Sequence, residues 1–188
     1  METGLAQNKG QVLHTPRLSL RRLCPADVDA IFAIIGDPIA MQYFPRSYTW
    51  EDAVEWIERN LRRYERDGYG IMAIVLNTTG DVIGDCGIAR QDVEGESMLE
   101  VGYHLRRDHW GHGYATEAAR ACMDYAFREL GAGKVVALIR PGNMPSRRVA
   151  ERNGMRVERQ VTHAGLPHLM YAAGNRHLPQ ACSVPNIL

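Results

Sequence analysis

Near the middle of the chain, a strand pattern at residues 98–105 leads through a short turn into a long helix pattern at residues 113–130. The turn contains Gly111 and Gly113, and glycine lets a backbone come close to a ligand. The first N–H groups of a helix have no partner inside the helix, and the helix dipole favours negative charge there. The junction therefore predicts an anion site suited to a diphosphate. A tight turn without a ligand is the plainer alternative.

Two common nucleotide-binding motifs do not match this turn. A P-loop is excluded because no Gly-Lys-Ser or Gly-Lys-Thr follows the glycines. The dinucleotide fingerprint requires a third glycine and a βαβ unit, which this stretch does not provide. If the turn holds a diphosphate, the ligand belongs to another class.

The remaining periodicities predict a mixed α/β chain around one sheet. Alternating or β-branched patterns predict strands, and apolar residues at helical spacing predict helices. The predicted strands cover residues 15–23, 71–76, 82–89, 98–105, 134–139, 155–163 and 169–173, and the predicted helices cover residues 25–35, 49–67, 113–130 and 145–153. Strands and helices alternate irregularly around a central hairpin, so the fold class is α/β of the mixed α+β kind.

Length, charge and cysteine content narrow the class of protein. The 188 residues suit a single domain. A formal net charge of zero argues against a nucleic-acid partner, and no apolar run approaches the ~18 residues of a membrane span. No CxxC pair occurs, which favours a reducing cytoplasm. The four cysteines are Cys24, Cys86, Cys122 and Cys182.

Three stretches carry a family resemblance. Residues 100–103 read EVGY and residues 110–118 read WGHGYATEA. Residues 143–155 read NMPSRRVAERNGM, and residues 15–21 read TPRLSLR. Together they resemble the GNAT superfamily of N-acetyltransferases, in the branch that contains the ribosomal-protein N-terminal acetylases RimJ and RimL. The likeness covers about residues 13–173, which is nearly the whole chain.

The resemblance implies one acetyltransferase domain over residues 13–175, with a central, mostly antiparallel splayed sheet flanked by helices. A polar extension at residues 1–12 and a C-terminal tail at residues 176–188 would flank it. Acetyl-CoA would be the co-substrate, without a metal, and a primary amine would attack it directly in a ternary complex. A protein or peptide N-terminus is the favoured acceptor. A small amine (antibiotic, polyamine or amino-acid derivative) and a non-catalytic acyl-CoA binding module are the alternatives, and a homodimer is compatible with the sequence.

The resemblance also implies roles for individual residues. The backbone of Tyr103, His104 and Leu105 would pair with the pantetheine arm. Asn143 would hydrogen-bond the pantetheine, and Ser146 would lie near the sulfur. The loop that would hold the pyrophosphate consists of Trp110, Gly111, His112, Gly113, Tyr114, Ala115 and Thr116.

The chain departs from the family pattern at two informative positions. Trp110 stands where the wider family often has Gln or Arg, although Trp is common in the RimJ and RimL branch. Ala150 stands where a tyrosine often acts as the acid that protonates the leaving thiolate. Ser146 is then the nearest candidate for that acid.

Acetyl transfer needs a base, because an amine attacks a thioester only when it is neutral. The reference pKa of a lysine is near ~10.4 and that of an α-amine near ~7.7–8.0, so an α-amine needs little help. Glu100 is the first candidate and His104 the second. In the alternative interpretation, Glu100 only balances the charge of Arg106 or Arg107. His104 would then be a satisfied or exposed histidine of the strand without a catalytic role.

Two further groups of side chains have open interpretations. His104, His109 and His112 fall within nine residues, but neither cysteine ligands nor an HExxH helix accompany them, so we expect no metal site. Four aromatic residues could wall the acceptor pocket, form ordinary core or form a lid. They are Tyr43, Phe44, Tyr48 and Trp50.

Overall fold

A computed structural model of the chain describes residues 12–175. The expected tail at residues 176–188 and the expected extension, except for Val12, lie outside the described residues. One eight-stranded sheet runs in the order β1-β2-β3-β4-β5-β6-β8-β7. Its strands are β1 Val12–His14, β2 Leu18–Arg22, β3 Ile71–Leu76, β4 Val82–Val93, β5 Glu96–Leu105, β6 Lys134–Ile139, β7 Arg156–His163 and β8 Leu166–Gly174.

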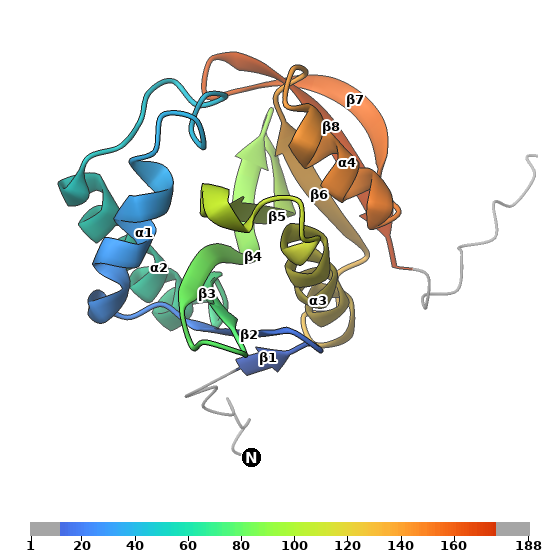
Figure 1. Cartoon of the computed structure of the whole chain (residues 1–188). Coiled ribbons are helices and arrows are strands. Elements are labelled where there is room, and N and C mark those ends of the chain that lie inside the picture. The colour runs from blue at the N-terminus through green and yellow to red at the C-terminus, as the bar shows by residue number, and fades with distance from the viewer. Residues whose placement is uncertain (1–11, 176–188) are drawn as a thin grey trace, which may run out of the picture.

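The sheet is antiparallel except between β5 and β6, which lie side by side in Figure 1. Those two strands are parallel, and their pairing consists of Glu100 opposite Val136. By contrast, β4 and β5 pair along ten positions. The sheet is therefore splayed between β5 and β6, as the predicted fold class requires.

Four helices cover the two faces of the sheet (Figure 1). They are α1 Val28–Ile35, α2 Trp50–Asp67, α3 Tyr114–Arg128 and α4 Met144–Arg152. Ala73 packs in one core cluster with α1 and α2, while its neighbours Met72 and Ile74 pack in another with α3 and α4. Side chains alternate across a strand, so the two helix pairs lie on opposite faces. Among the described helices, none is long and apolar enough to cross a membrane.

Local sequence signals account for the ends and packing of the helices. The Thr49 side chain accepts from the Asp52 N–H, the Asp52 carboxylate accepts from the Thr49 N–H, and Gly68 ends α2 at φ +80°. Small buried residues let α3 lie close to the sheet, where the sulfurs of Cys122 and Cys86 are 3.5 Å apart. The predicted helices are confirmed to within one or two residues at most ends.

The strands differ from prediction at two places. The single strand expected over residues 15–23 is a hairpin of β1 and β2, because Thr15 N–H donates to the Leu18 carbonyl and closes a turn. The central hairpin is also longer than expected, and β4 continues to Val93. Its turn uses two left-handed residues, Glu94 and Gly95.

Candidate active site

The glycine turn forms an open backbone loop at the start of α3. Gly111 and Gly113 both have φ +81°, a conformation that L side chains rarely adopt. A Cβ on Gly111 would meet no atom within 4 Å, and one on Gly113 would meet only the tip of Arg17 at 3.6 Å. Gly113 is the N-cap and supplies no side chain to the first amides of the helix. These amides therefore remain available to an anion.

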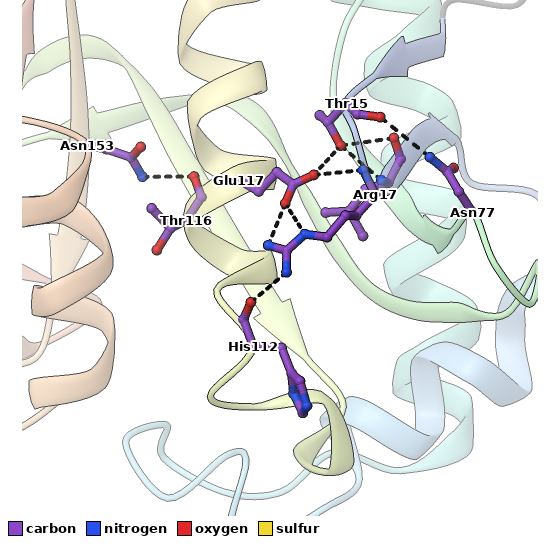
Figure 2. Close-up of polar contacts among 8 residues, drawn as sticks. Thr15, Arg17, Asn77, His112, Thr116, Glu117 and Asn153 are labelled. Atoms are coloured by element: carbon purple, nitrogen blue, oxygen red, sulfur yellow. Dashed lines mark hydrogen bonds and ion pairs between the residues drawn. The ribbon is translucent and has the colours of Figure 1, made fainter.

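Thr116 adds a hydroxyl to this group of donors. Its Oγ1 is buried and has no hydrogen-bond partner among the described residues. Its carbonyl accepts from the Asn153 side chain at 3.2 Å, which ties the first turn of α3 to the end of α4 (Figure 2). An unpaired buried hydroxyl beside uncapped amides fits an anionic ligand such as a diphosphate.

Arg17, in the turn between β1 and β2, supports the loop through a hydrogen bond to its backbone (Figure 2). Its Nε donates to Glu117 Oε2 at 2.7 Å, and its Nη1 donates to the His112 carbonyl at 2.9 Å. Thr15 Oγ1 donates to Glu117 Oε1 at 2.7 Å. Burial would raise the pKa of Glu117, but the bonds from Thr15 and Arg17 lower it overall. Glu117 thus stays ionised and holds Arg17 against the loop.

Arg17→Ala is expected to weaken acetyl-CoA binding about tenfold without unfolding the protein. The variant loses the bond to the His112 carbonyl, and a charge-assisted hydrogen bond is worth roughly one such factor. Calorimetric titration measures the affinity. Arg66→Ala is the matched control, since it also removes an exposed arginine from an ion pair with a carboxylate, that of Asp67, but at the far end of α2. Equal affinity in both variants would contradict a supporting role for Arg17.

Trp110 connects the loop to the end of β5. Its indole N–H donates to the Leu105 carbonyl at 2.9 Å. The ring of His112 stacks on Tyr114 with centroids 5.6 Å apart, and Arg17 covers the same Tyr114 ring at 4.6 Å. His112, Tyr114 and Arg17 therefore pack on one another, while the Trp110 side chain remains 39% exposed.

Across the splay, the start of α4 is joined to β5 by hydroxyl groups. Ser146 Oγ donates to the Tyr103 phenol oxygen at 3.1 Å, and that phenol donates to the Ser146 carbonyl at 2.9 Å. Burial raises the pKa of Tyr103, so its phenol stays protonated. Asn143 Oδ1 caps α4 by accepting from the Ser146 N–H at 3.2 Å. The predicted residues Tyr103, Asn143 and Ser146 thus lie together at one side of the splay.

His104 points to the other face of β5, because it follows Tyr103 on a strand. Its Nδ1 lies 2.8 Å from Oδ1 of Asp85, which is only 1% exposed. The second oxygen of Asp85 accepts from the Trp56 indole N–H at 2.8 Å. The His104 ring also contacts Phe44, with centroids 5.4 Å apart.

Asp85 raises the pKa of His104. Burial alone would lower that pKa, but the charge of Asp85 and its hydrogen bond, together with the charge of Glu100, raise it above the ordinary value. Asp85 was not among the site residues predicted from the sequence. The available signal was an acid in the middle of the apolar strand at residues 82–89, where an unpaired carboxylate would be costly.

Glu100 lies on the same face of β5 as His104. It is located where β5 and β6 are still paired, before the two strands diverge. Its Oε1 accepts from the Leu138 N–H at 3.3 Å, which bridges the diverging strands. Burial raises the pKa of Glu100. The expectation that Glu100 balances Arg106 or Arg107 is wrong, because Arg106 pairs with Asp108 and Arg107 with Asp37.

The three histidines of the sequence cluster face different partners. His104 meets Asp85, the His109 Nε2 lies 2.8 Å from Arg106, and His112 stacks on Tyr114. Within residues 12–175, no group of three or more His, Cys, Asp or Glu side chains is arranged to hold a metal ion.

A groove of about 430 Å³ opens beside Phe44, between the loop that joins α1 to α2 and the loop that follows β6. In Figure 1 the first of these loops reaches toward the β7–β8 hairpin. The lining residues are Gln42, Tyr43, Phe44, Pro45, Arg140, Pro141, Gly142, Leu166 and Pro167.

The four aromatic residues of this region occupy the groove, the core and the exposed surface. Tyr43 and Phe44 line the groove. Tyr48 packs against the core of α1 and α2, and Trp50 is 45% exposed with its indole N–H on Asp29. Only the first two therefore form a wall.

A sheet splayed between two parallel strands, with an uncapped glycine loop at the next helix, defines the acyl-CoA-dependent acetyltransferase class of fold. Comparison with known families agrees, because residues 17–156 match the Acetyltransferase (GNAT) domain. The chain therefore belongs to the GNAT acetyltransferases and is an N-acetyltransferase. The loop donors, including the unpaired Thr116 hydroxyl, fit the pyrophosphate of acetyl-CoA.

Individual relatives cover most of the chain. YkkB, an uncharacterised protein of Bacillus subtilis, is 39% identical over 162 residues, which is 85% of this chain and 93% of that protein. An acetyltransferase structure from Agrobacterium tumefaciens is 32% identical, with a TM-score of 0.76, over 87% of this chain and 94% of that one. RimL, the ribosomal L7/L12 α-N-protein acetyltransferase solved with coenzyme A, shares the fold at 20% identity and a TM-score of 0.68, covering 87% and 98%.

Proposed function

We propose that this enzyme transfers the acetyl group of acetyl-CoA to a primary amine by direct attack in a ternary complex, with His104 as the base. The observation that carries the proposal is the pair of Asp85 on β4 and His104 on β5, 2.8 Å apart, next to the groove. The glycine loop at the end of the same strand lies ready for the pyrophosphate. A peptide N-terminus is the preferred acceptor, in keeping with the RimJ and RimL resemblance.

The cofactor supplies the acetyl group as a reactive thioester, and the chain supplies its binding site. In this proposal, the amides of residues 111–116 and the Thr116 hydroxyl bind the pyrophosphate. The backbone of Tyr103, His104 and Leu105 binds the pantetheine arm along the edge that β6 leaves open after Glu100. The Asn143 side chain, whose Oδ1 caps α4, offers its amide N–H groups to the same arm.

His104 is suited to accept the proton of the incoming amine. The Asp85 carboxylate can only accept a hydrogen bond, so Nδ1 of His104 carries a proton and Nε2 carries the lone pair. An α-amine has a reference pKa near ~7.7–8.0 and is partly neutral at pH 7, so a histidine base suffices. Glu100 fits the task less well, because its carboxylate is engaged by the Leu138 N–H.

Ser146→Ala is expected to lower turnover about tenfold or more, with acetyl-CoA affinity within about twofold of wild type. The reason is that Ser146 is the hydroxyl proposed to protonate the leaving thiolate, and general acids contribute rate rather than ground-state binding. Thiol release measures turnover and calorimetry measures affinity. Ser97→Ala, an exposed position on β5, is the control. Wild-type turnover in Ser146→Ala would exclude Ser146 as the acid.

A product assay tests the proposed function as a whole. Purified protein is incubated with acetyl-CoA and a panel of peptides and small amines, and free thiol and acetylated amine are both measured. Equal amounts of thiol and acetylated amine are expected. Binding of acetyl-CoA without thiol release for any amine would instead indicate a non-catalytic acyl-CoA binding module.

A further inference from the structure

The groove beside Phe44 has a mostly uncharged lining with a single positive charge among the described residues. Apolar, aromatic and amide groups dominate its lining, and Arg140 is the one charged side chain among the described lining residues. No acidic side chain belongs to that lining. An acceptor with several positive charges, such as a polyamine or an aminoglycoside, would therefore find no counter-charge in the groove.

Arg140 keeps most of its hydrogen-bonding capacity. It is half-buried at the end of β6, and its Nη1 donates to the Pro167 carbonyl at 3.3 Å. Among the described residues, no carboxylate lies within ion-pair distance of Arg140. A guanidinium has five N–H donors in a planar fork that matches a carboxylate. The remaining donors of Arg140 suit an anionic group of a ligand.

The tip of the β7–β8 hairpin, which lines one side of the groove, carries two histidines rather than carboxylates. His163 and His168 on the β7–β8 hairpin have ring centroids 5.7 Å apart. Burial lowers the pKa of His168, and the nearby His163 and Arg140 lower it further. Two carboxylates on neighbouring elements have partners other than Arg140, since Asp37 pairs with Arg107 and Glu100 accepts from the Leu138 N–H.

The groove also lies next to the proposed base. Phe44 lines the groove and contacts the His104 ring, so one side chain separates the two. At the other side, Gly142 lies beside Tyr43, and a Cβ on Gly142 would make an ordinary van der Waals contact of 3.8 Å with the Tyr43 ring. An acceptor held by Arg140 would thus reach toward His104 along an aromatic wall.

Building on the proposed function, we infer that the acceptor is a peptide N-terminus with an acidic side chain in its first residues, which pairs with Arg140 in this groove. The apolar lining suits the peptide body, and the guanidinium selects the carboxylate. Charge complementarity distinguishes the acceptor classes, because Arg140 repels a cationic side chain and attracts a carboxylate.

The test compares kcat/KM for three peptides that differ only at the second residue: Ala-Asp-Ala-Ala, Ala-Asn-Ala-Ala and Ala-Lys-Ala-Ala. Wild-type enzyme is expected to prefer the aspartate peptide to the asparagine peptide about tenfold. Arg140→Gln should bring that ratio close to one, mainly by lowering kcat/KM for the aspartate peptide. Arg140→Glu should favour the lysine peptide. Arg128→Gln, an exposed position at the end of α3, should keep the wild-type ratios.

Three outcomes would overturn the inference. They are equal use of all three peptides by wild type, an unchanged ratio in Arg140→Gln, and faster acetylation of free aspartate than of any peptide. In each of them thiol is still released, so acetyl transfer to an amine would stand, and the third outcome would only replace the peptide by a small acceptor. Absence of thiol release with every amine would instead refute the proposed function, and the two failures are therefore distinguishable.

Discussion

Replacing Gly113 with Trp is expected to reduce acetyl-CoA affinity at least 100-fold while the protein remains folded. Gly113 caps α3 at φ +81°, and its Cβ position faces open space apart from the tip of Arg17. An indole there would fill the path of the pyrophosphate and turn the first amides of α3 away from it. The measurement is a calorimetric titration with acetyl-CoA, with a thermal melt to verify folding.

Two controls separate steric blocking from backbone strain. Gly95 has φ +85° and open space around its Cβ position, but it lies in the turn between β4 and β5. Gly95→Trp therefore introduces comparable strain of about 1–2 kcal/mol and should leave acetyl-CoA binding unchanged. Gly113→Ala should have an intermediate effect. Wild-type affinity in Gly113→Trp would refute the assignment of this loop to the pyrophosphate.

The helices were predictable because the signals that set their ends act within one turn. Thr49, Asp52 and Gly68 frame α2, and the predicted range of 49–67 became Trp50–Asp67. The glycine loop was likewise visible as a local pattern. The cap that Asn143 provides for α4 was not predicted, because Asn143 was assigned to the pantetheine arm. The splayed sheet followed from the family resemblance rather than from periodicity, because strand pairing is not a local property.

Strand boundaries were harder to predict where polar residues continue a strand. Arg90 and Gln91 end the apolar pattern of the central hairpin, yet they pair with Leu99 and Met98 in the structure. Backbone hydrogen bonds across the hairpin hold that extension, and side-chain polarity does not report on them. The turn at Thr15 was not predicted either. It joins β2 to β1, and β1 is only three residues long (Val12–His14), which is too short to show a strand pattern.

The parts of the candidate site that escaped prediction are contacts between distant positions. Arg17 and Glu117 are 100 residues apart in sequence, and Asp85 and His104 are 19 apart. Their pairing depends on sheet register and on where α3 lies, which one sequence does not fix. The choice between Glu100 and His104 as base depends on the same information. Both are ionisable residues on one face of β5, and their different partners separate them.

His104→Gln is expected to lower turnover about 100-fold or more while acetyl-CoA affinity stays close to wild type. General base catalysis contributes on the order of 10²–10⁴ in rate, and glutamine preserves the size and polarity of the side chain without its basicity. Thiol release at saturating acetyl-CoA measures the effect. His14→Gln, which alters an exposed histidine that bonds Ser19 on β2, is the matched control.

The pH dependence of the wild-type rate should identify the same group. The base works as neutral imidazole, so the rate should rise with pH as His104 loses its proton. Because Asp85 raises the pKa of His104, that midpoint should lie above the ordinary value of ~6.5. Asp85→Asn removes the raising charge, so it should move the midpoint to lower pH and also reduce the rate by loosening control of the tautomer.

Glu100→Gln decides between the two candidate bases. If His104 is the base, the variant should keep most of the turnover, and its midpoint should move only slightly to lower pH, because Glu100 adds a small part of the upward shift in the pKa of His104. Loss of both turnover and the pH-dependent rise in Glu100→Gln, with near-normal turnover in His104→Gln, would transfer the role to Glu100. The groove and the glycine loop would then keep their assignments, because neither depends on which residue accepts the proton.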